Sequence, residues 1–447
     1  PAGWFQLREA QACCILFESA IPSFNLDISR LRWLQYMELH SFFLYLALML
    51  MTARLFSELA GRFGIPSVIG ELLAGLLLGP SLLGWVTPDT TMKLLAEIGI
   101  ILLLFEVGMD TDLLRLAKSG LKPLVVAVVG FALPFVLGYA VCRWGFGLDN
   151  LVALFIGGTL TATSIGITVR VLEDIGQRQS DEAQIVIGAA VLDDILGVIA
   201  LAFLYQFAVQ GEVSGGVVGK VALYIALFML LSPFVAKLAG GIIDHYDQRA
   251  ATPGLLVTMA LALILLFSWL AHVVGAPMIM GGFAAGIALS QHFRFDLMHR
   301  LGLPALDRWF APSPKLAHRL EHQMRPLIHT FAPIFFVMVG VSLNLNAVDW
   351  HSPNVWQLGG ALIGVAVIGK LAAGFFIRES RFRQVAIGLA MIPRGEVGLI
   401  FAQLGLHQRI LNAETYAALL IVIALTTIAP PFILKAYYGL ASKRVAA

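Results

Sequence analysis

The chain has 447 residues, of which 59% are hydrophobic and only 13% are charged, and its mean hydropathy is +0.84. A water-soluble domain carries about a quarter charged residues, so the composition excludes an ordinary soluble enzyme and indicates a membrane protein. The formal net charge of +2 gives no reason to expect a nucleic-acid partner. The three cysteines, Cys13, Cys14 and Cys142, match neither a metal-site spacing nor a disulfide framework.

Residues 1–40 precede the first long apolar segment, and we expect them to form an N-terminal extension outside the membrane domain. Position 1 is proline, while Met37 begins the segment MELHSFFLYLALMLM, which has the character of a natural start. The extension is therefore interpreted as a segment that need not be native. It lacks the compact charged-then-apolar layout of a signal peptide, and we assign it no function.

From Ser41 onward the chain contains about thirteen apolar segments that are candidates to cross a bilayer, which requires roughly 20 residues per helix. The pattern predicts an all-α polytopic membrane protein with a membrane domain at 41–438, a long loop at 292–326 and a short tail at 439–447. The expected spans are 41–60, 64–84, 92–109, 121–142, 151–172, 183–209, 217–240, 252–273, 276–291, 327–345, 355–377, 383–406 and 415–438.

The basic residues give the chain an orientation. When the residue-41 end is placed outside, alternate loops and the C-terminus face the cytoplasm, and these contain nearly all of the loop Lys and Arg. The loop 292–326 alone contains six of them. This asymmetry satisfies the positive-inside rule, and it predicts a multi-pass protein of the inner membrane with a cytoplasmic C-terminus.

Two segments of the chain resemble each other. GIPSVIGELLAG at 64–75 shares five of its twelve positions with GAPMIMGGFAAG at 275–286. We therefore predict two five-span repeats, 64–209 and 275–438. Because seven spans separate their starts, the repeats begin on opposite faces of the membrane, and inverted repeats of this kind are typical of secondary transporters. A chance likeness between glycine- and alanine-rich helices is the alternative interpretation.

Glycines four residues apart predict close helix packing, with a dimer contact as the second interpretation. There are three such pairs: Gly75 with Gly79, Gly282 with Gly286, and Gly360 with Gly364.

Ionisable side chains within spans are costly and are therefore functional hypotheses. Asp193 and Asp194 are adjacent in the apolar segment IGAAVLDDILGVIALAF, and on a helix they point about 100° apart. Lys370 lies in LIGVAVIGKLAAGFF and needs a counter-charge, for which either aspartate is a candidate. The alternatives are a misplaced span boundary at the aspartates and a lysine that reaches the cytoplasmic face. Glu71 and Glu106 are interpreted as carboxylates packed against polar neighbours or near an interface, and gating residues are the alternative interpretation.

Two expected spans make poor continuous helices. The fifth contains FIGGTLTATSIGITV and the twelfth contains GLAMIPRGEVGLIFAQLG. Glycine and proline weaken a helix, and hydroxyl groups can satisfy the freed backbone groups. We predict interruptions near Thr161 and Gly395, where Arg394 and Glu396 offset the half-helix ends, pair with each other or face a cavity.

The motifs together resemble the second branch of the monovalent cation:proton antiporters, and the NapA-type sodium/proton antiporters are the most similar group. The motifs are GELLAGLLLGPSLLG, TATSIGIT, the Asp-Asp pair, the intramembrane lysine and MIPRGEVGLIFA. The resemblance covers about residues 41 to 438. It implies a transporter domain with the NhaA/NapA-like antiporter fold, in which a dimerisation domain accompanies a core domain with two crossed, partly unwound helices. It also implies a homodimer with elevator-like alternating access, without enzyme chemistry or a cofactor.

The resemblance also assigns roles to residues. Asp194 would be the carboxylate that binds sodium and the proton, and Asp193 would pair with Lys370. Thr163 and Ser164 would line the cation site. The crossing helices would be supported by three further residues: Thr161, Arg394 and Glu396.

The predicted function is exchange of sodium, or lithium, for protons across the bilayer. A potassium/proton antiporter, or a Kef-like potassium efflux protein without its nucleotide-binding domain, is the alternative within transport. An intramembrane enzyme would need a motif such as H-E-x-x-H or G-x-S-x-G, and the sequence contains neither. A receptor or scaffold would have no reason to bury two aspartates and a lysine among broken helices.

Overall fold

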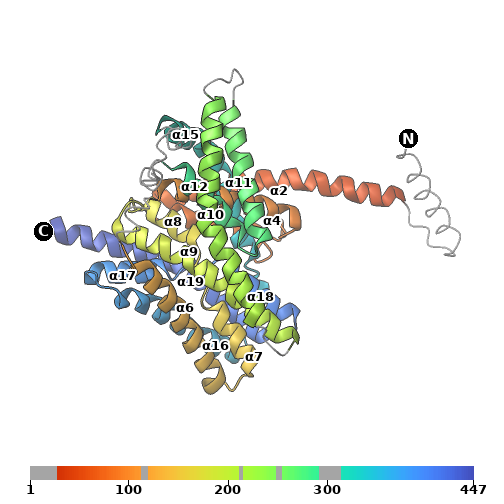
Figure 1. Ribbon diagram of the computed structural model, residues 1–447. Helices are drawn as coiled ribbons and strands as arrows, with labels where there is room; N and C mark the ends of the chain where they lie inside the picture. Colours follow the sequence, from red (N-terminus) through yellow and green to blue (C-terminus); the bar gives the residue numbers. More distant parts are fainter. Residues whose placement is uncertain (1–27, 112–118, 211–214, 248–253, 291–313, 447) are drawn as a thin grey trace. The chain divides into compact units, whose positions relative to one another are not determined.

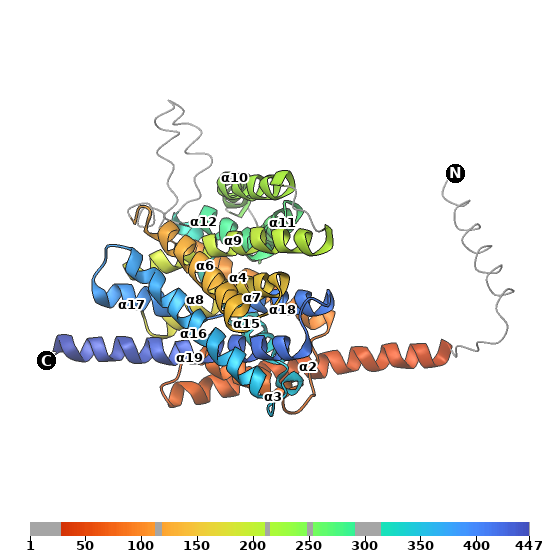
Figure 2. The same ribbon diagram turned by 90° about the horizontal axis from the view of Figure 1, so that it is seen from below.

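The computed structural model describes residues 28–111, 119–210, 215–247, 254–290 and 314–446. Within these ranges the chain is helical and contains no β-strand (Figure 1, Figure 2), as the composition predicts. The chain divides into two units, residues 1–48 and residues 49–447. The described part of the first unit is the N-terminal portion of helix α2, and the second unit contains everything discussed below.

The helices are α2 (Ile28–Arg62), α3 (Ser67–Leu78), α4 (Thr90–Asp110), α6 (Lys122–Ala140), α7 (Asn150–Thr159), α8 (Ile165–Asp174), α9 (Asp181–Gln210), α10 (Gly215–Asp247), α11 (Leu255–Val273), α12 (Met278–Leu289), α15 (Pro314–Ser342), α16 (Pro353–Ala373), α17 (Arg381–Ala390), α18 (Glu396–His407) and α19 (Ala413–Ala446), with short η1 (Val141–Gly145), η2 (Leu345–Ala347) and η3 (Gly374–Phe376).

Helix length and composition indicate a multi-pass membrane protein. Every expected span contains helical residues, but several are short, interrupted or charged, as in α4, where Lys93, Glu97 and Glu106 lie among apolar residues. Within the described ranges, seven helices are long and apolar enough to cross a membrane: Ser41–Arg62, Lys122–Gly145, Asp181–Leu201, Leu255–Val273, Leu316–Ser342, Pro353–Phe376 and Ala413–Leu440. The shorter apolar helices are Ser67–Leu78, Asn150–Thr159, Ala222–Ser232, Met278–Leu289 and Val397–Leu406.

The two segments with similar sequences also have similar local structures. Helices α3 and α12 each have 12 residues and each follow a proline, Pro66 with φ −55° and ψ 138° and Pro277 with φ −57° and ψ 138°. The turns before them contain Gly64 with φ 67° and Gly275 with φ 83°. This left-handed conformation is open to glycine without steric cost, so the chain makes the same turn before α3 as before α12.

Helices α2 (from residue 49), α3, α4, α11, α12 and α15 pack together, and we call them the flanking bundle. Backbones approach closely where glycine removes the side chain. A Cβ on Gly75 of α3 would lie 2.0 Å from the Val337 oxygen of α15, and one on Gly286 of α12 would lie 2.1 Å from the Phe105 oxygen of α4. Glycine is therefore required at both contacts, and the pairs α3–α15 and α12–α4 pack in the same way.

The other helices, α6, α7, α8, α9, α16, α17, α18 and α19, form a second group that we call the site bundle. Helices α6 and α16 lie side by side in it (Figure 2). Gly369 of α16 packs on Pro134 of α6, where a Cβ would lie 2.8 Å from the proline ring. Helix α10 contacts α12 of the flanking bundle and α9 of the site bundle, so it links the two groups.

The structure changes two sequence-based expectations. Helix α15 begins at Pro314, within the expected loop 292–326, because the apolar residues Leu316, Leu320 and Met324 recur every four residues and are buried together; residues 291–313 lie outside the described residues. The packing predicted for Gly360 and Gly364 is wrong within the described chain, since a Cβ on either would meet no atom within 4 Å.

Candidate functional site

The first helix break lies between α7, which ends at Thr159, and α8, which begins at Ile165. The interruption is centred near Thr161, as the sequence predicts. Hydroxyl groups bind backbone oxygens at the end of α7: the Thr161 hydroxyl donates to the Gly158 oxygen at 2.8 Å, and the Thr159 hydroxyl donates to the Phe155 oxygen at 2.9 Å. The break is thus stabilised by its own side chains.

The second break separates α17, which ends at Ala390, from α18, which begins at Glu396. It contains Pro393, which has no N–H to continue a helical ladder. The hydroxyl of Thr427 in α19 lies 2.6 Å from the Arg394 oxygen and 2.6 Å from the Ile423 oxygen of its own helix, and it can donate to either. Glu396 is placed by its backbone as the first residue of α18.

The two breaks are in direct contact. The Ser164 amide donates to the Pro393 oxygen at 2.8 Å, and the Thr163 hydroxyl donates to the Met391 oxygen at 3.1 Å. A Cβ on Gly395 would stand 2.7 Å from the Ser164 hydroxyl oxygen, so a side chain at that position would displace the serine. Ser164 itself is 2% exposed, and its hydroxyl has no hydrogen-bond partner among the described residues.

Asp193 of α9 and Lys370 of α16 form an ion pair inside the site bundle. The Lys370 Nζ donates to Asp193 Oδ2 at 3.0 Å, and both side chains are fully buried. Leaving either charge buried alone would be strongly unfavourable, whereas the pair is neutral. Of the two aspartates that the sequence offers as partners for the lysine, the structure brings Asp193 into contact.

Asp194 follows Asp193 on α9 and points in another direction, since successive helical residues are about 100° apart. It is 6% exposed. Asp193 is the aspartate that Lys370 contacts.

Arg394 is the other buried cation near the breaks. Its side chain is fully buried, and NH1 donates to the Ala162 oxygen at 2.8 Å. That oxygen lies just beyond the carbonyl end of α7, where the helix dipole is negative. The Arg394 guanidinium, which belongs to the second break, therefore stabilises the unwound segment of the first break.

Sequence reasoning missed two hydroxyl groups that contact the breaks. The Thr168 hydroxyl in α8 donates to the Ala390 oxygen at 2.8 Å, and the Thr427 hydroxyl lies within hydrogen-bond distance of the Arg394 oxygen as described above. Thr427 could have been found as one of two adjacent threonines in a mostly apolar span. The sequence around Thr168 gives no comparable signal for its contact with Ala390.

Across the described ranges, no group of three or more His, Cys, Asp or Glu side chains could hold a metal ion. Helix α9, which contains the two buried aspartates, packs against α7 and α8 on either side of the first break. The breaks themselves contain hydroxyl and backbone oxygens. Such hard oxygen donors suit a small cation.

A membrane domain that interrupts two helices where they touch, and buries a carboxylate beside them, belongs to the class of secondary transporters. The family described as "Sodium/hydrogen exchanger, transmembrane" matches residues 46–438, and the chain belongs to this family.

Several curated proteins are similar along most of their length. The high-affinity Na⁺/H⁺ antiporter NhaS3 of Synechocystis is 32% identical over 435 residues, which cover 89% of this chain and 90% of the relative. The Na⁺/H⁺-K⁺ antiporter GerN of Bacillus cereus is 33% identical over 411 residues, with 91% and 98% covered. The Na⁺/H⁺ antiporter of Enterococcus hirae is 31% identical over 395 residues, with 87% and 96% covered.

Among solved structures, the sodium proton antiporter MjNhaP1 from Methanocaldococcus jannaschii at pH 8 superposes with a TM-score of 0.63. It covers 89% of this chain and 96% of its own chain at 17% identity. A likeness at this identity establishes the antiporter fold.

Proposed function

We propose that this protein is a secondary active transporter that exchanges sodium, or lithium, for protons across a membrane. The observation that carries the proposal is the fully buried Lys370–Asp193 pair with Asp194 next to it on the same helix. Membership of the sodium/hydrogen exchanger family and the names of the similar antiporters support the choice of cargo. A transporter of this kind moves ions and carries out no enzyme chemistry.

Exchange follows from competition for one carboxylate. Lys370 balances the charge of Asp193. In the proposed cycle Asp194 is the carboxylate that the cargo neutralises. A proton or a sodium ion can neutralise it, but the two cannot bind together. A charged carboxylate crosses the low-dielectric part of the membrane at high cost, so the loaded forms move and the empty form does not. One site with two mutually exclusive ligands is sufficient for antiport.

In the proposed site, Ser164 and Thr163 supply oxygens for a sodium ion held at Asp194. The buried Ser164 hydroxyl, which has no hydrogen-bond partner among the described residues, supports this role. Thr163 already donates to the Met391 oxygen, and its own oxygen still has a lone pair for a cation. Thr161, Arg394 and Glu396 support the crossing helices, and no resident cofactor takes part.

We extend the proposal to the architecture. The transporter domain has about thirteen spans in two inverted repeats, 64–209 and 275–438, and works as a homodimer. The matched contacts of α3–α15 and α12–α4 support the repeats. The site bundle moves against the flanking bundle in an elevator-like cycle, and the C-terminus is cytoplasmic. The clustering of the end of α4, the end of α8 and the start of α15 supports the predicted alternation of loops.

The test is proton movement in sealed proteoliposomes that contain a pH-sensitive dye. Addition of sodium or lithium to acid-loaded vesicles should cause dequenching. A larger response to potassium would favour the alternative of potassium/proton exchange, for which the name of GerN gives a precedent. No response to any of the three cations would refute the proposal.

A further inference from the structure

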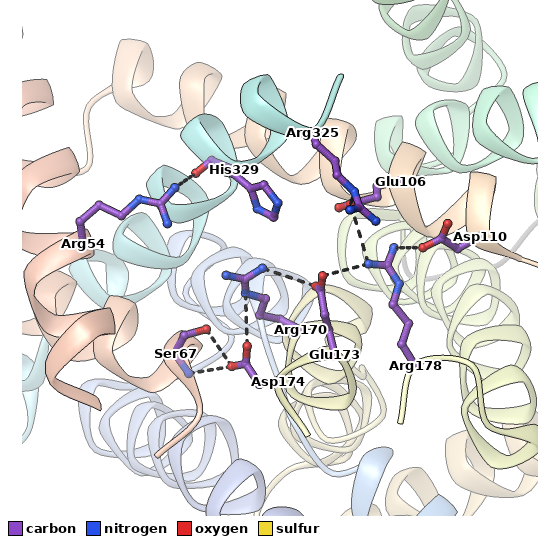
Figure 3. Close-up of polar contacts among 10 residues, drawn as sticks. All are labelled: Arg54, Ser67, Glu106, Asp110, Arg170, Glu173, Asp174, Arg178, Arg325 and His329. Atoms are coloured by element: carbon purple, nitrogen blue, oxygen red, sulfur yellow. Dashed lines mark hydrogen bonds and ion pairs between the residues drawn. The ribbon is translucent and has the colours of Figure 1, made fainter. Parts of the chain in front are cut away.

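A charged cluster lies apart from the breaks, where the beginning of α3, the end of α4, the end of α8 and the beginning of α15 come together (Figure 3). We call it the end cluster. It includes Ser67, Glu106, Asp110, Glu173, Asp174, Arg178 and Arg325. It is not explained by ion binding at Asp194, because it belongs to other segments of the chain.

Some contacts of the end cluster join the two bundles. Asp174, the last residue of α8, accepts hydrogen bonds from the Ser67 amide at 2.6 Å and from the Ser67 hydroxyl at 2.7 Å. Arg178, which follows α8, contacts Asp110 of α4 at 2.9 Å and Glu106 of α4 at 3.9 Å. Arg178 thus joins the site bundle to two carboxylates of the flanking bundle.

Arg178 is also fixed to its own bundle. Its NH1 is 3.3 Å from Glu173 Oε1 on α8. The Arg178 side chain is 11% exposed and that of Glu106 is 3% exposed. Ion pairs with so little exposure are screened less by salt than surface pairs, so the connection has energetic weight.

Arg325 of α15 provides an internal comparison. Its Nε is 3.9 Å from Glu106 Oε1, the same separation and the same acceptor oxygen as for Arg178 NH1. However, Arg325 and Glu106 both belong to the flanking bundle. The Glu106 carboxylate therefore contacts Arg178, which belongs to the site bundle, and Arg325, which belongs to its own bundle.

We propose that Arg178 and Asp174 form a latch that joins the site bundle to the flanking bundle in this conformation and opens once in every transport cycle. The inference rests on the proposed function, since alternating access requires the two bundles to move against each other. Movement of α8 along α3 and α4 must break the Ser67–Asp174 and Arg178–Asp110 contacts. The Arg325–Glu106 contact stays intact, because both residues belong to the flanking bundle and move together.

Disulfide trapping tests the latch. In a background with Cys13, Cys14 and Cys142 replaced, the pair Ser67→Cys and Asp174→Cys should cross-link on oxidation. The cross-linked protein should lose sodium-driven proton movement in vesicles, and reductant should restore it. The controls are the single variants Ser67→Cys and Asp174→Cys in the same background; neither can form the bond, so oxidation should leave the transport of each unchanged.

The outcomes separate the two proposals. Wild-type transport by the 67–174 cross-linked protein, or failure of that pair to cross-link, would overturn the latch. Absence of sodium-driven proton movement in the native protein would overturn the proposed function instead.

Arg178 is tested by the rate of the same cross-linking reaction. Arg178→Gln should slow cross-linking of the 67–174 pair by about fivefold, the lower range of a typical coupling between two states. Arg325→Gln removes an equidistant partner from the same carboxylate and should change the rate by less than about twofold. Equal effects of the two variants would show that Arg178 has no special role in joining the bundles.

Discussion

Two lysine–carboxylate pairs in the site bundle have similar geometry and very different surroundings. Lys370 and Asp193 are 3.0 Å apart with both side chains fully buried. Lys122 and Glu379 are 2.7 Å apart, with side-chain exposures of 35% and 13%. Distance alone would rank the second pair as the stronger. Solvent screening and desolvation reverse that order, because a charge that loses its partner in the interior cannot turn to water.

The comparison shows where an ion pair can serve transport. At Lys122 and Glu379 water replaces a lost partner, so the charge state of either residue has little effect on the rest of the bundle. At Asp193 and Lys370 any change of charge must be compensated at once by a proton, a cation or a movement. This sensitivity makes the buried pair, and Asp194 beside it, suitable for coupling ions to conformational change.

The largest effect should come from Asp194→Asn, which keeps the shape of the side chain and removes its exchangeable charge. The variant should insert and fold like the native protein, yet its sodium-driven proton movement in vesicles should fall to the background of empty liposomes. Asp193→Asn is the matched control and should be milder. If Asp194→Asn were fully active and Asp193→Asn inactive, Asp193 and not Asp194 would be the carboxylate that binds the cation and the proton.

The next effect tests the cost of leaving one buried charge alone. Lys370→Met removes the ammonium group while filling a similar volume. Loss of one partner of a buried pair costs about 3 kcal/mol or more, so the apparent Tm of the purified protein in detergent should fall clearly. The double variant Lys370→Met with Asp193→Asn removes both charges and should recover most of the loss. A double variant no more stable than the single one would contradict this account of the pair.

These residues also show what could be predicted from the sequence. Asp193, Asp194 and Lys370 are conspicuous because each interrupts a long apolar run, and the breaks near Thr161 and Gly395 are confirmed because glycine, proline and hydroxyl residues gather there. Apolar periodicity and loop charge were sufficient for the all-helical membrane fold. The assignment of Asp194 to cation binding remains a prediction.

Other features could not be predicted, because they depend on which distant segments meet. The residues alone left open which aspartate contacts Lys370; the family resemblance implied Asp193, and the structure contains that contact. Nothing in the sequence near Thr168 indicates that its hydroxyl reaches the Ala390 oxygen, 222 positions away. Likewise, Arg178 lies in a short polar connection, and only the packing of α8 beside α4 brings it to Asp110.

A moderate effect is expected from Ser164→Ala. If the serine hydroxyl is a sodium ligand, its loss removes one neutral donor worth about 1 kcal/mol, and the sodium KM should rise about fivefold. The control is Thr426→Ala, because the Thr426 hydroxyl donates within its own helix to the Val422 oxygen at 2.6 Å. An unchanged sodium KM in Ser164→Ala would remove this residue from the site.

The exposed pair should give a small effect. Lys122→Gln removes a partner that is 35% exposed, and exposed ion pairs contribute about 0–1 kcal/mol. The apparent Tm in detergent should shift far less than for Lys370→Met, and sodium-driven proton movement should match that of the native protein. A loss of stability as large as that of Lys370→Met would mean that burial does not distinguish the two pairs.

The smallest effect is a dependence on pH that belongs to the exposed pair. The hydrogen bond from Lys122 lowers the pKa of Glu379 below its ordinary value of 4.5. A carboxyl group whose pKa is lower in the folded state binds protons more tightly in the unfolded state, so its contribution to stability is present above the ordinary pKa and is lost as the pH falls through the folded value.

Glu379→Gln lacks this contribution at every pH. The difference in apparent Tm between native protein and variant should therefore be constant from about pH 7 to 5 and should shrink below about pH 4.5. Lys122→Gln removes the hydrogen bond, so it should flatten the same profile while leaving the carboxyl group in place. A difference that grows as the pH falls would show that another group controls the acid stability of this end of the site bundle.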